Sequence, residues 1–343
     1  MEMKLIPIIA ATFLLVGCSG ISDKPDASRG IYLNAWLAGN EIRLNEYVVR
    51  MRNTGINTVI IHMQDTDGIL PYDSKIPYAI EINATEIRIK NVSALVDRLH
   101  ADGFYVIAKV DTFKDRKLAY AHPEYAFSYK NGSLFEDRFG VHIDPNNPVV
   151  WEYKKAIYEE MFDFGFDEVM IDYIRYPERA YYGALNSPFT KGDTSMETIE
   201  GFMQYIRASL PYQTFSVAIF SNVCLGEDHA IGQSVDIFAP YVQYISPMLY
   251  VSLDPYEPWQ DARGFIAKRT EACLIRIQGS NAKLRPWLQG YSDRYQTMNA
   301  SAIQQQIKTV ERFPGVAGWQ IWNSAGNYNA TFKALEENKS NRG

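Results

Sequence analysis

The sequence predicts a (β/α)8 TIM barrel. Short apolar runs alternate with longer amphipathic runs from Arg29 onward, and the chain contains eight of each. A short apolar run without polar alternation is typical of a strand buried on both faces, as in a parallel sheet. Eight such strands, each followed by a helix, are the pattern of an α/β barrel. The 343 residues, 47% hydrophobic and 22% charged, are enough for one such domain.

The boundaries of the elements follow from local signals. The predicted strands cover residues 30–35, 58–63, 105–110, 168–173, 215–220, 244–250, 285–289 and 316–322. The predicted helices cover residues 42–53, 92–101, 149–162, 196–210, 230–238, 259–276, 300–311 and 329–338. Asn147 and Pro148 supply an N-cap and a first-turn proline, and Thr194 with Glu197 forms a capping box. The long segments 111–148 and 177–193 are predicted to lie as loops or extra elements over the strand ends.

The N-terminus predicts export and lipid anchoring. A charged start and a short apolar stretch lead into Leu15-Val16-Gly17-Cys18, which matches a bacterial lipobox. We therefore expect a lipoprotein signal peptide over residues 1–17, acylation of Cys18, a polar tether over 18–28, the barrel over 29–338 and a tail over 339–343. Acyl chains on Cys18 would anchor the protein to the cell envelope, at the outer membrane if the cell has one. A plain secretory signal is the alternative.

Composition excludes some classes of partner and site. The net charge of −6, without a basic cluster, argues against nucleic acid as a partner. The five histidines show no metal-ligand spacing, so we expect no metal and no cofactor. Cys224 and Cys273 could form a disulfide in an oxidising compartment or remain two buried thiols.

The segment 165–177, GFDEVMIDYIRYP, is the strongest functional signal. Its apolar run ends at Asp172, where the fourth strand leaves the core. In α/β barrels, active sites are built at the carboxyl ends of the strands. Asp172 is therefore a candidate nucleophile or base, with Arg175 keeping it ionised through the opposite charge. A purely structural pair between Asp172 and Arg175 is the alternative.

Other strand ends carry polar and aromatic residues that suit a sugar. Paired carboxylates surrounded by aromatic faces are what glycoside hydrolysis requires. The predicted ligand contacts are Asp65, Arg175, Tyr250, Gln289, Trp319 and Trp322. Several of these have plainer interpretations: residues 65–68 are rich in turn formers, and at least one of the two tryptophans could fill the core. His62, inside an apolar strand, is expected to be a core histidine.

The ordered set of motifs resembles a bacterial family of TIM-barrel, glycosyl hydrolase-like domains first catalogued as a domain of unknown function. The matching segments are 29–33, 57–61, 65–68, 113–115, 121–124, 137–140, 143–146, 165–177, 245–250, 285–289 and 318–323. The resemblance covers about Arg29 to Leu335. It implies the barrel, a glycosidase-like cleft and a carbohydrate substrate.

Two positions depart from the pattern of that family. The family's fifth strand carries an acidic residue where this chain has Ala218, and its seventh strand continues into an aspartate where this chain has Gly290. Asp172 could therefore lack its partner. The remaining candidates for a second acid are Asp65, Asp67, Asp111, Glu178, Asp254 and Asp293, with Asp67 and Glu178 ranked first. A glycosidase is the first hypothesis, and a glycan-binding or scaffold lipoprotein that has lost an acid is the second.

Overall fold

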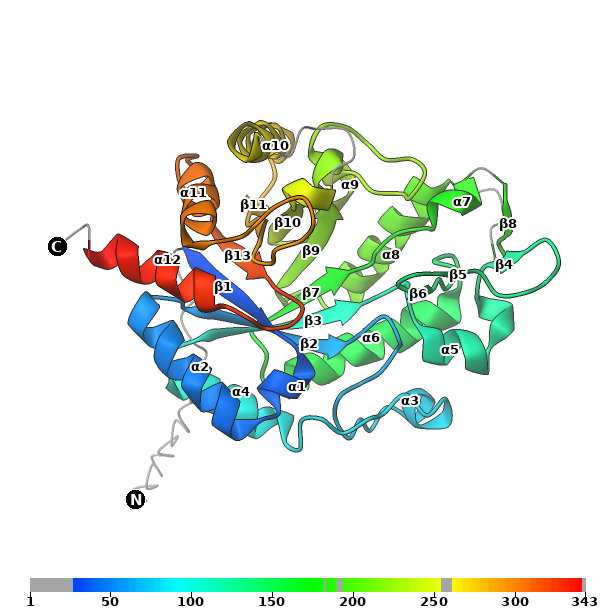
Figure 1. The fold of residues 1–343 in the computed structure, drawn as a ribbon. Helices are drawn as coiled ribbons and strands as arrows, with labels where there is room; N and C mark the ends of the chain where they lie inside the picture. Colours follow the sequence, from blue (N-terminus) through cyan, green and yellow to red (C-terminus); the bar gives the residue numbers. More distant parts are fainter. Residues whose placement is uncertain (1–26, 182, 190–193, 254–260, 341–343) are drawn as a thin grey trace, which may run out of the picture.

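The computed structural model describes residues 27–181, 183–189, 194–253 and 261–340. Its strands form one closed parallel barrel surrounded by helices (Figure 1). In barrel order, the strands are β1 (Ser28–Leu33), β2 (Thr58–Gln64), β3 (Tyr105–Asp111), β7 (Glu168–Asp172), β9 (Phe215–Phe220), β10 (Tyr244–Leu249), β11 (Lys283–Leu284) with β12 (Trp287–Gln289), and β13 (Gly318–Trp322). Parallel pairing of β13 with β1 and of β9 with β10 closes the ring. The predicted (β/α)8 fold is confirmed.

The outer layer contains the helices that the sequence pattern predicts. These are α2 (Glu41–Thr54), α4 (Val92–Ala101), α6 (Pro148–Asp163), α8 (Ser195–Ser209), α9 (Val235–Phe238), α10 (Ala262–Arg276), α11 (Ala300–Val310) and α12 (Asn329–Ser340). Asn147 caps α6, and the capping box of Thr194 and Glu197 starts α8. The predicted helix 230–238 is shorter because Gly232, with a positive φ of 74°, belongs to a turn before Ser234 caps α9.

The seventh strand also differs from its predicted extent. It begins earlier, at Lys283, and is divided into β11 and β12 by Arg285 and Pro286. Proline lacks the backbone N–H that a continuous ladder needs. Both pieces still pair with β10, so the barrel remains closed.

The segments predicted to cover the strand ends contain short elements of their own. After β3 come α5 (Arg116–Ala121), the 3-10 turn η1 (Pro123–Tyr125), β4 (Ser128–Tyr129), β5 (Glu136–Asp137) and β6 (Gly140–Val141), and after β7 come α7 (Glu178–Tyr181) and β8 (Leu185–Asn186). Further short elements are α1 (Ala35–Ala38), α3 (Pro77–Glu81), η2 (Ser221–Cys224) and η3 (Val251–Leu253). The two-stranded sheet β4–β8 and the hairpin β5–β6 project at the end toward which β3 and β7 point (Figure 1).

Two apolar cores hold the barrel together. The larger one lies between the sheet and the helices, and it includes Val150, Ile157 and Met161 from the predicted inner face of α6. The smaller one fills the barrel interior with side chains such as Ile60 and Met170.

A disulfide joins Cys224, after β9, to Cys273 in α10. Among the described residues, no helix is long and apolar enough to cross a membrane. The predicted signal peptide, Cys18 and most of the tether lie outside the described residues.

Candidate active site

Asp172 ends β7 beside Asp111, which ends β3, and the two residues are register partners. Since side chains of a strand alternate between faces, Lys109 shares the interior face of β3 with Asp111. Asp172 is 8% exposed and Asp111 is buried. The carboxyl ends of two neighbouring strands therefore place two carboxylates and one ammonium at the mouth of the barrel.

The chain leaves β7 in a strained conformation. Tyr173 has a φ of 49°, in the left-handed region that residues with a side chain rarely adopt. Asp172 Oδ1 accepts a hydrogen bond of 2.6 Å from the Tyr173 N–H. The backbone N–H groups of Thr112 and Phe113 donate to the carbonyls of Asp172 and Tyr173 and fix the turn. Backbone strain held in this way is concentrated at functional sites.

Lys109 bridges the two carboxylates. Its Nζ lies 2.5 Å from Asp111 Oδ1 and 2.7 Å from Asp172 Oδ2. These two oxygens are therefore no more than about 5 Å apart. Burial alone would lower the pKa of Lys109, but the charges of Asp111 and Asp172 outweigh burial and raise it. Burial opposes ionisation of Asp111 as well, yet Lys109 and then His62 lower its pKa to about 2.

A histidine and two aromatic rings extend this network across the mouth. His62 Nε2 lies 3.2 Å from Asp111 Oδ2, and His62 Nδ1 hydrogen-bonds the Tyr32 hydroxyl at 2.9 Å. The ring centroids of Tyr32 and Trp322 are 4.0 Å apart, and Lys109 Nζ lies 5.5 Å from the Trp322 centroid. A register shift in the β2–β3 pairing occurs directly after His62. Bulges of this kind commonly re-aim side chains beside active sites.

The structure changes the partner expected for Asp172. Arg175 donates from Nη1 to the Tyr176 carbonyl at 3.0 Å, and no carboxylate of the described residues lies within ion-pair distance of it. Lys109, rather than Arg175, pairs with Asp172. The reason is the pleat, which points Lys109 into the barrel beside Asp172, whereas Arg175 follows the turn away from the strand end.

Asp67 and Glu178 lie further out, whereas Asp65 lies close enough to His62 and Asp111 for both to affect its pKa. Asp67 pairs with Arg116 at 2.5 Å, and its side chain is 48% exposed. Glu178 begins α7 and is exposed. Asp65 accepts two backbone N–H bonds and pairs with Arg88 at 3.2 Å. Burial raises the pKa of Asp65, with Asp111 adding to the rise and His62 opposing it.

The predicted sugar contacts fall into two groups. Trp322 is partly exposed at the mouth, whereas Trp319 is 1% exposed and donates to Glu311 after α11. The two tryptophans are an odd number of residues apart, so they point to opposite faces of β13. Gln289 is buried and bonded to Ser252 and to the Tyr291 carbonyl.

Tyr250 is also nearly buried, and its ring packs edge-on against Tyr291. Trp319 and Gln289 are therefore buried, whereas Tyr250 belongs to the interior cluster that contains Tyr32 and against which Trp322 packs.

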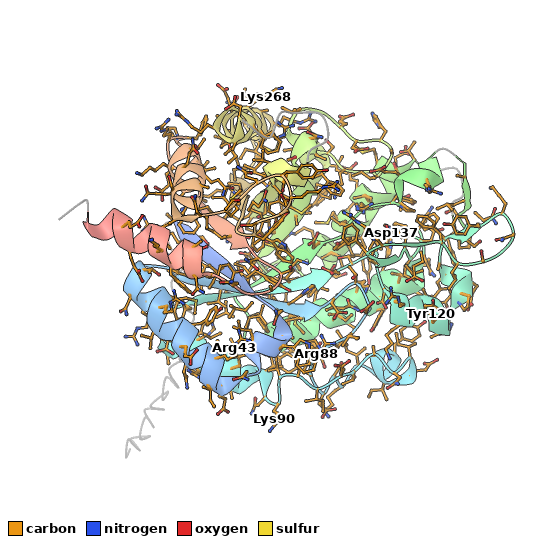
Figure 2. All side chains as sticks on the ribbon, viewed as in Figure 1. Arg43, Arg88, Lys90, Tyr120, Asp137 and Lys268 are labelled. Atoms are coloured by element: carbon orange, nitrogen blue, oxygen red, sulfur yellow. A yellow bond between two sulfur atoms is a disulfide. The ribbon has the colours of Figure 1, made fainter. Side chains whose placement is uncertain are left out.

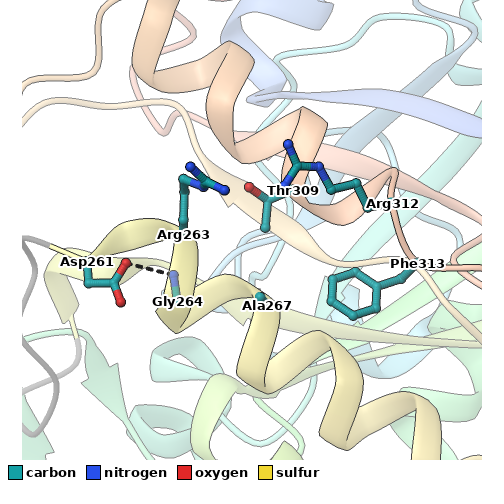
Figure 3. Close-up of a pocket in the computed structure, with 7 residues that line it drawn as sticks. All are labelled: Asp261, Arg263, Gly264, Ala267, Thr309, Arg312 and Phe313. Carbon is teal, nitrogen blue, oxygen red and sulfur yellow. Dashed lines mark hydrogen bonds between the residues drawn. The ribbon is translucent and has the colours of Figure 1, made fainter.

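A cavity of about 380 Å³ lies elsewhere, between α10 and the end of α11 (Figure 3). Arg263, Thr309, Arg312 and Phe313 contribute to its lining. Phe313 belongs to the connection from α11 into β13, at the amino ends of the strands. This cavity is therefore separate from the carboxylates at the mouth.

Lys109, His62 and Tyr32 were not among the predicted site residues. Period-two alternation carried a usable signal, because a lysine two positions before a strand-end aspartate must share its face. His62 was expected in the core, but it lies one pleat above Ile60, at the mouth. The described residues contain no group of three or more His, Cys, Asp or Glu side chains that could hold a metal ion.

Comparisons with known structures agree with this fold. A protein described as hypothetical, from Ruminiclostridium thermocellum, is 33% identical, with 55% of this chain and 96% of that chain covered and a TM-score of 0.51. The PgaB (BpsB) glycoside hydrolase domain from Bordetella bronchiseptica is 12% identical, with 90% and 98% covered and a TM-score of 0.66. A GH18 chitinase from Pseudoalteromonas aurantia is 14% identical, with 91% and 99% covered and a TM-score of 0.57. At these low identities the last two show a shared fold.

A search of curated protein sequences found no match. The model of the family described as "Putative glycosyl hydrolase domain" matches residues 30–328, which include β2, β3, β7 and β13 and every residue of the carboxylate network. The chain therefore belongs to this glycosyl hydrolase-like family.

Proposed function

We propose that the protein is a glycosidase that hydrolyses O-glycosyl bonds in a polysaccharide or oligosaccharide at the cell envelope. The observation that carries this proposal is the position of Asp172. It ends β7 at the barrel mouth, pairs with Lys109, keeps 8% of its surface exposed and lies beside a strained turn. Family membership supports the same class of reaction.

Asp172 would act as the nucleophile or as the base. As nucleophile, its oxygen would form a bond to the anomeric carbon while the bond to the leaving oxygen breaks. As base, it would take a proton from the attacking water. In both cases Lys109 and Tyr173 fix the carboxylate, and Trp322 offers an aromatic face for the sugar ring.

Asp65 would supply the proton for the leaving oxygen. A general acid needs a raised pKa and access to the ligand, and burial raises the pKa of Asp65. Its side chain is 26% exposed, whereas Asp111 is buried and bonded to Lys109. The proposal therefore moves the second catalytic acid from Asp67 and Glu178 to Asp65.

The N-terminal sequence supports the proposed location. The lipobox before Cys18 supports export and acylation. The disulfide between Cys224 and Cys273 supports an oxidising compartment, since such bonds persist outside the cytosol.

A non-catalytic glycan-binding lipoprotein is the second candidate, and Gly290 favours it. A Cβ at Gly290 would lie 2.5 Å from Ile321 Cγ2 and 2.9 Å from the Trp322 carbonyl. This backbone therefore leaves no room for an acidic side chain at that position. In the fifth strand, buried Ala218 occupies the position at which the family pattern has an acidic residue.

Release of reducing ends from a panel of bacterial and plant polysaccharides tests the proposal. The protein would start at Ser19 and be compared with Asp172→Asn and with Glu178→Gln as an exposed control. Turnover that is lost only in Asp172→Asn supports the glycosidase. Equal turnover in all three proteins would place the catalytic site away from Asp172. No turnover of any polysaccharide by the folded protein would favour the glycan-binding candidate.

A further inference from the structure

A row of alternating aromatic rings and cations passes beside Asp172. At its centre is Tyr173, whose ring centroid lies 5.2 Å from Lys114 Nζ and 5.9 Å from Arg175 Cζ. Lys109 Nζ lies 5.8 Å from the same centroid. Three cations therefore surround the ring that directly follows Asp172.

Both ends of the row are exposed aromatic rings. Arg175 Cζ lies 5.2 Å from the centroid of Phe220, which ends β9 and is 37% exposed. Lys114 Nζ lies 5.3 Å from the centroid of Phe139, which is 47% exposed and also contacts Arg138 at 4.2 Å. The row thus runs from the end of β9 to the β5–β6 hairpin. Asp137, next to Arg138 in that hairpin, is labelled in the right half of Figure 2.

The carboxylates nearby are already engaged by other cations. Lys109 holds Asp111 and Asp172, and Lys114 Nζ lies 2.5 Å from Asp137 Oδ1. Asp137 Oδ2 also lies 3.1 Å from the ring of His142. Burial lowers the pKa of His142 to about 3, so its ring is neutral at pH 7.

Arg175 therefore has no described carboxylate within ion-pair distance, as Arg138 also has none, and Arg175 is the one of the two that lies next to Tyr173. One of its nitrogens donates to the Tyr176 carbonyl. Its guanidinium carbon lies 5.9 Å from the centroid of Tyr173 and 5.2 Å from that of Phe220, so its charge is held next to two rings, in the turn that follows Asp172. Guanidinium groups held in this way suit carboxylate and sulfate groups, which accept two parallel hydrogen bonds.

A structural role for Arg175 would need only the bond to Tyr176. It would not require an exposed ring on its outer side. Exposed aromatic faces are typical of surfaces on which sugar rings stack, and the buried Lys114 positions the inner side of Phe139.

We propose that the row formed by Phe220, Arg175, Tyr173, Phe139 and Arg138 binds an anionic glycan, with Arg175 contacting the negative group of the sugar nearest Asp172. This inference rests on the proposed function in its placement of the scissile bond at Asp172. It names the substrate class as a polysaccharide bearing carboxylate or sulfate groups.

Calorimetric binding to the Asp172→Asn protein tests the proposal without turnover. The probes are oligogalacturonate, its fully methyl-esterified form as the neutral match, and sulfated galactan oligosaccharides, which separate carboxylate from sulfate. We expect at least one anionic probe to bind about tenfold or more tightly than the neutral one, with affinity falling as salt rises.

Arg175→Met, made in the Asp172→Asn background, should remove the preference for the anionic probe. Arg175→Lys in the same background should retain part of that preference. Arg116→Met is the matched control, because Arg116 is occupied by Asp67 and Glu136. Equal or tighter binding of the neutral probe, no binding of any anionic probe, or an unchanged preference in Arg175→Met would each overturn the inference. If anionic probes bind but the wild-type protein does not hydrolyse them, only the proposed glycosidase activity is contradicted. If the protein hydrolyses neutral chains at a rate that Arg175→Met leaves unchanged, only the anionic substrate class is contradicted.

Discussion

The two ends of β7 carry two buried carboxylates in contrasting surroundings. Glu168, at the amino end, pairs with Arg285, and both side chains are almost wholly buried. Tyr105 also donates to Glu168, at 3.2 Å. Asp172, at the carboxyl end, shares Lys109 with Asp111 and remains in contact with solvent.

This difference separates a structural ion pair from a reactive one. At the floor of the barrel, one cation serves one carboxylate, and no surface is open to a ligand. At the mouth, one cation serves two carboxylates, the next residue is strained, and aromatic rings border the exposed oxygen. The same strand thus stabilises the barrel at one end and offers chemistry at the other.

Glu168→Gln gives the largest expected change in stability. It leaves Arg285 buried and uncompensated, which costs about 3–5 kcal/mol. Chemical denaturation should show this loss, while the turnover number of the remaining folded protein stays near the wild-type value. A small stability loss with abolished turnover would reverse the roles assigned to the two ends of β7.

Asp65→Asn should affect the reaction rather than the fold. If Asp65 donates a proton to the leaving oxygen, turnover of natural glycans should fall by about 10²–10⁴-fold. Aryl glycosides with acidic leaving groups need little protonation and should lose far less. The ratio between the two substrate types is the measurement, and an equal loss on both would assign Asp65 to binding only.

Asp111 links stability at the mouth to pH. Lys109 and His62 lower its pKa to about 2 in the folded state, against roughly 4 when unfolded. The stabilisation, of the order of 2 kcal/mol, is therefore present above pH 4 and lost as the pH falls toward 2. Denaturation of wild type and Asp111→Asn at pH 5 and at pH 2 checks this. The stability difference should shrink on acidification, and a constant difference would contradict the charge-based explanation.

Tyr173→Gly should produce the smallest change in stability. Glycine adopts a positive φ without strain, which favours the variant by about 1 kcal/mol, offset in part by the lost ring contacts. Activity should nevertheless fall, since the ring no longer supports Lys109 and Arg175. Thermal unfolding and turnover measured together check this, and a marked destabilisation would show that the turn is not strained.

The sequence predicted much of the fold because barrel strands buried on both faces read as short apolar runs. Strand β9 begins and ends where the apolar pattern predicted, at Phe215 and Phe220. The division of the seventh strand was less visible, although Pro286 marks it. The role of Asp172 at a strand end followed from the same pattern, and it remains a prediction.

The partners of Asp172 were harder to predict, because they come from different strands. Arg175 is close in sequence, but Lys109 reaches Asp172 only through the register between β3 and β7. The opposite orientations of Trp319 and Trp322 follow from the pleat once β13 is placed. The positive φ of Tyr173 could not be predicted from its residue type, since glycine usually occupies such positions.

Chemical rescue tests most directly the claim that Asp172 performs the chemistry. Asp172→Gly would be incubated with an aryl glycoside that the wild-type protein hydrolyses, with and without sodium azide. We predict negligible turnover without azide, and restored release of the aryl group with a glycosyl azide product when azide occupies the space of the carboxylate. Wild-type turnover by Asp172→Gly, with no azide product, would contradict the central role of Asp172.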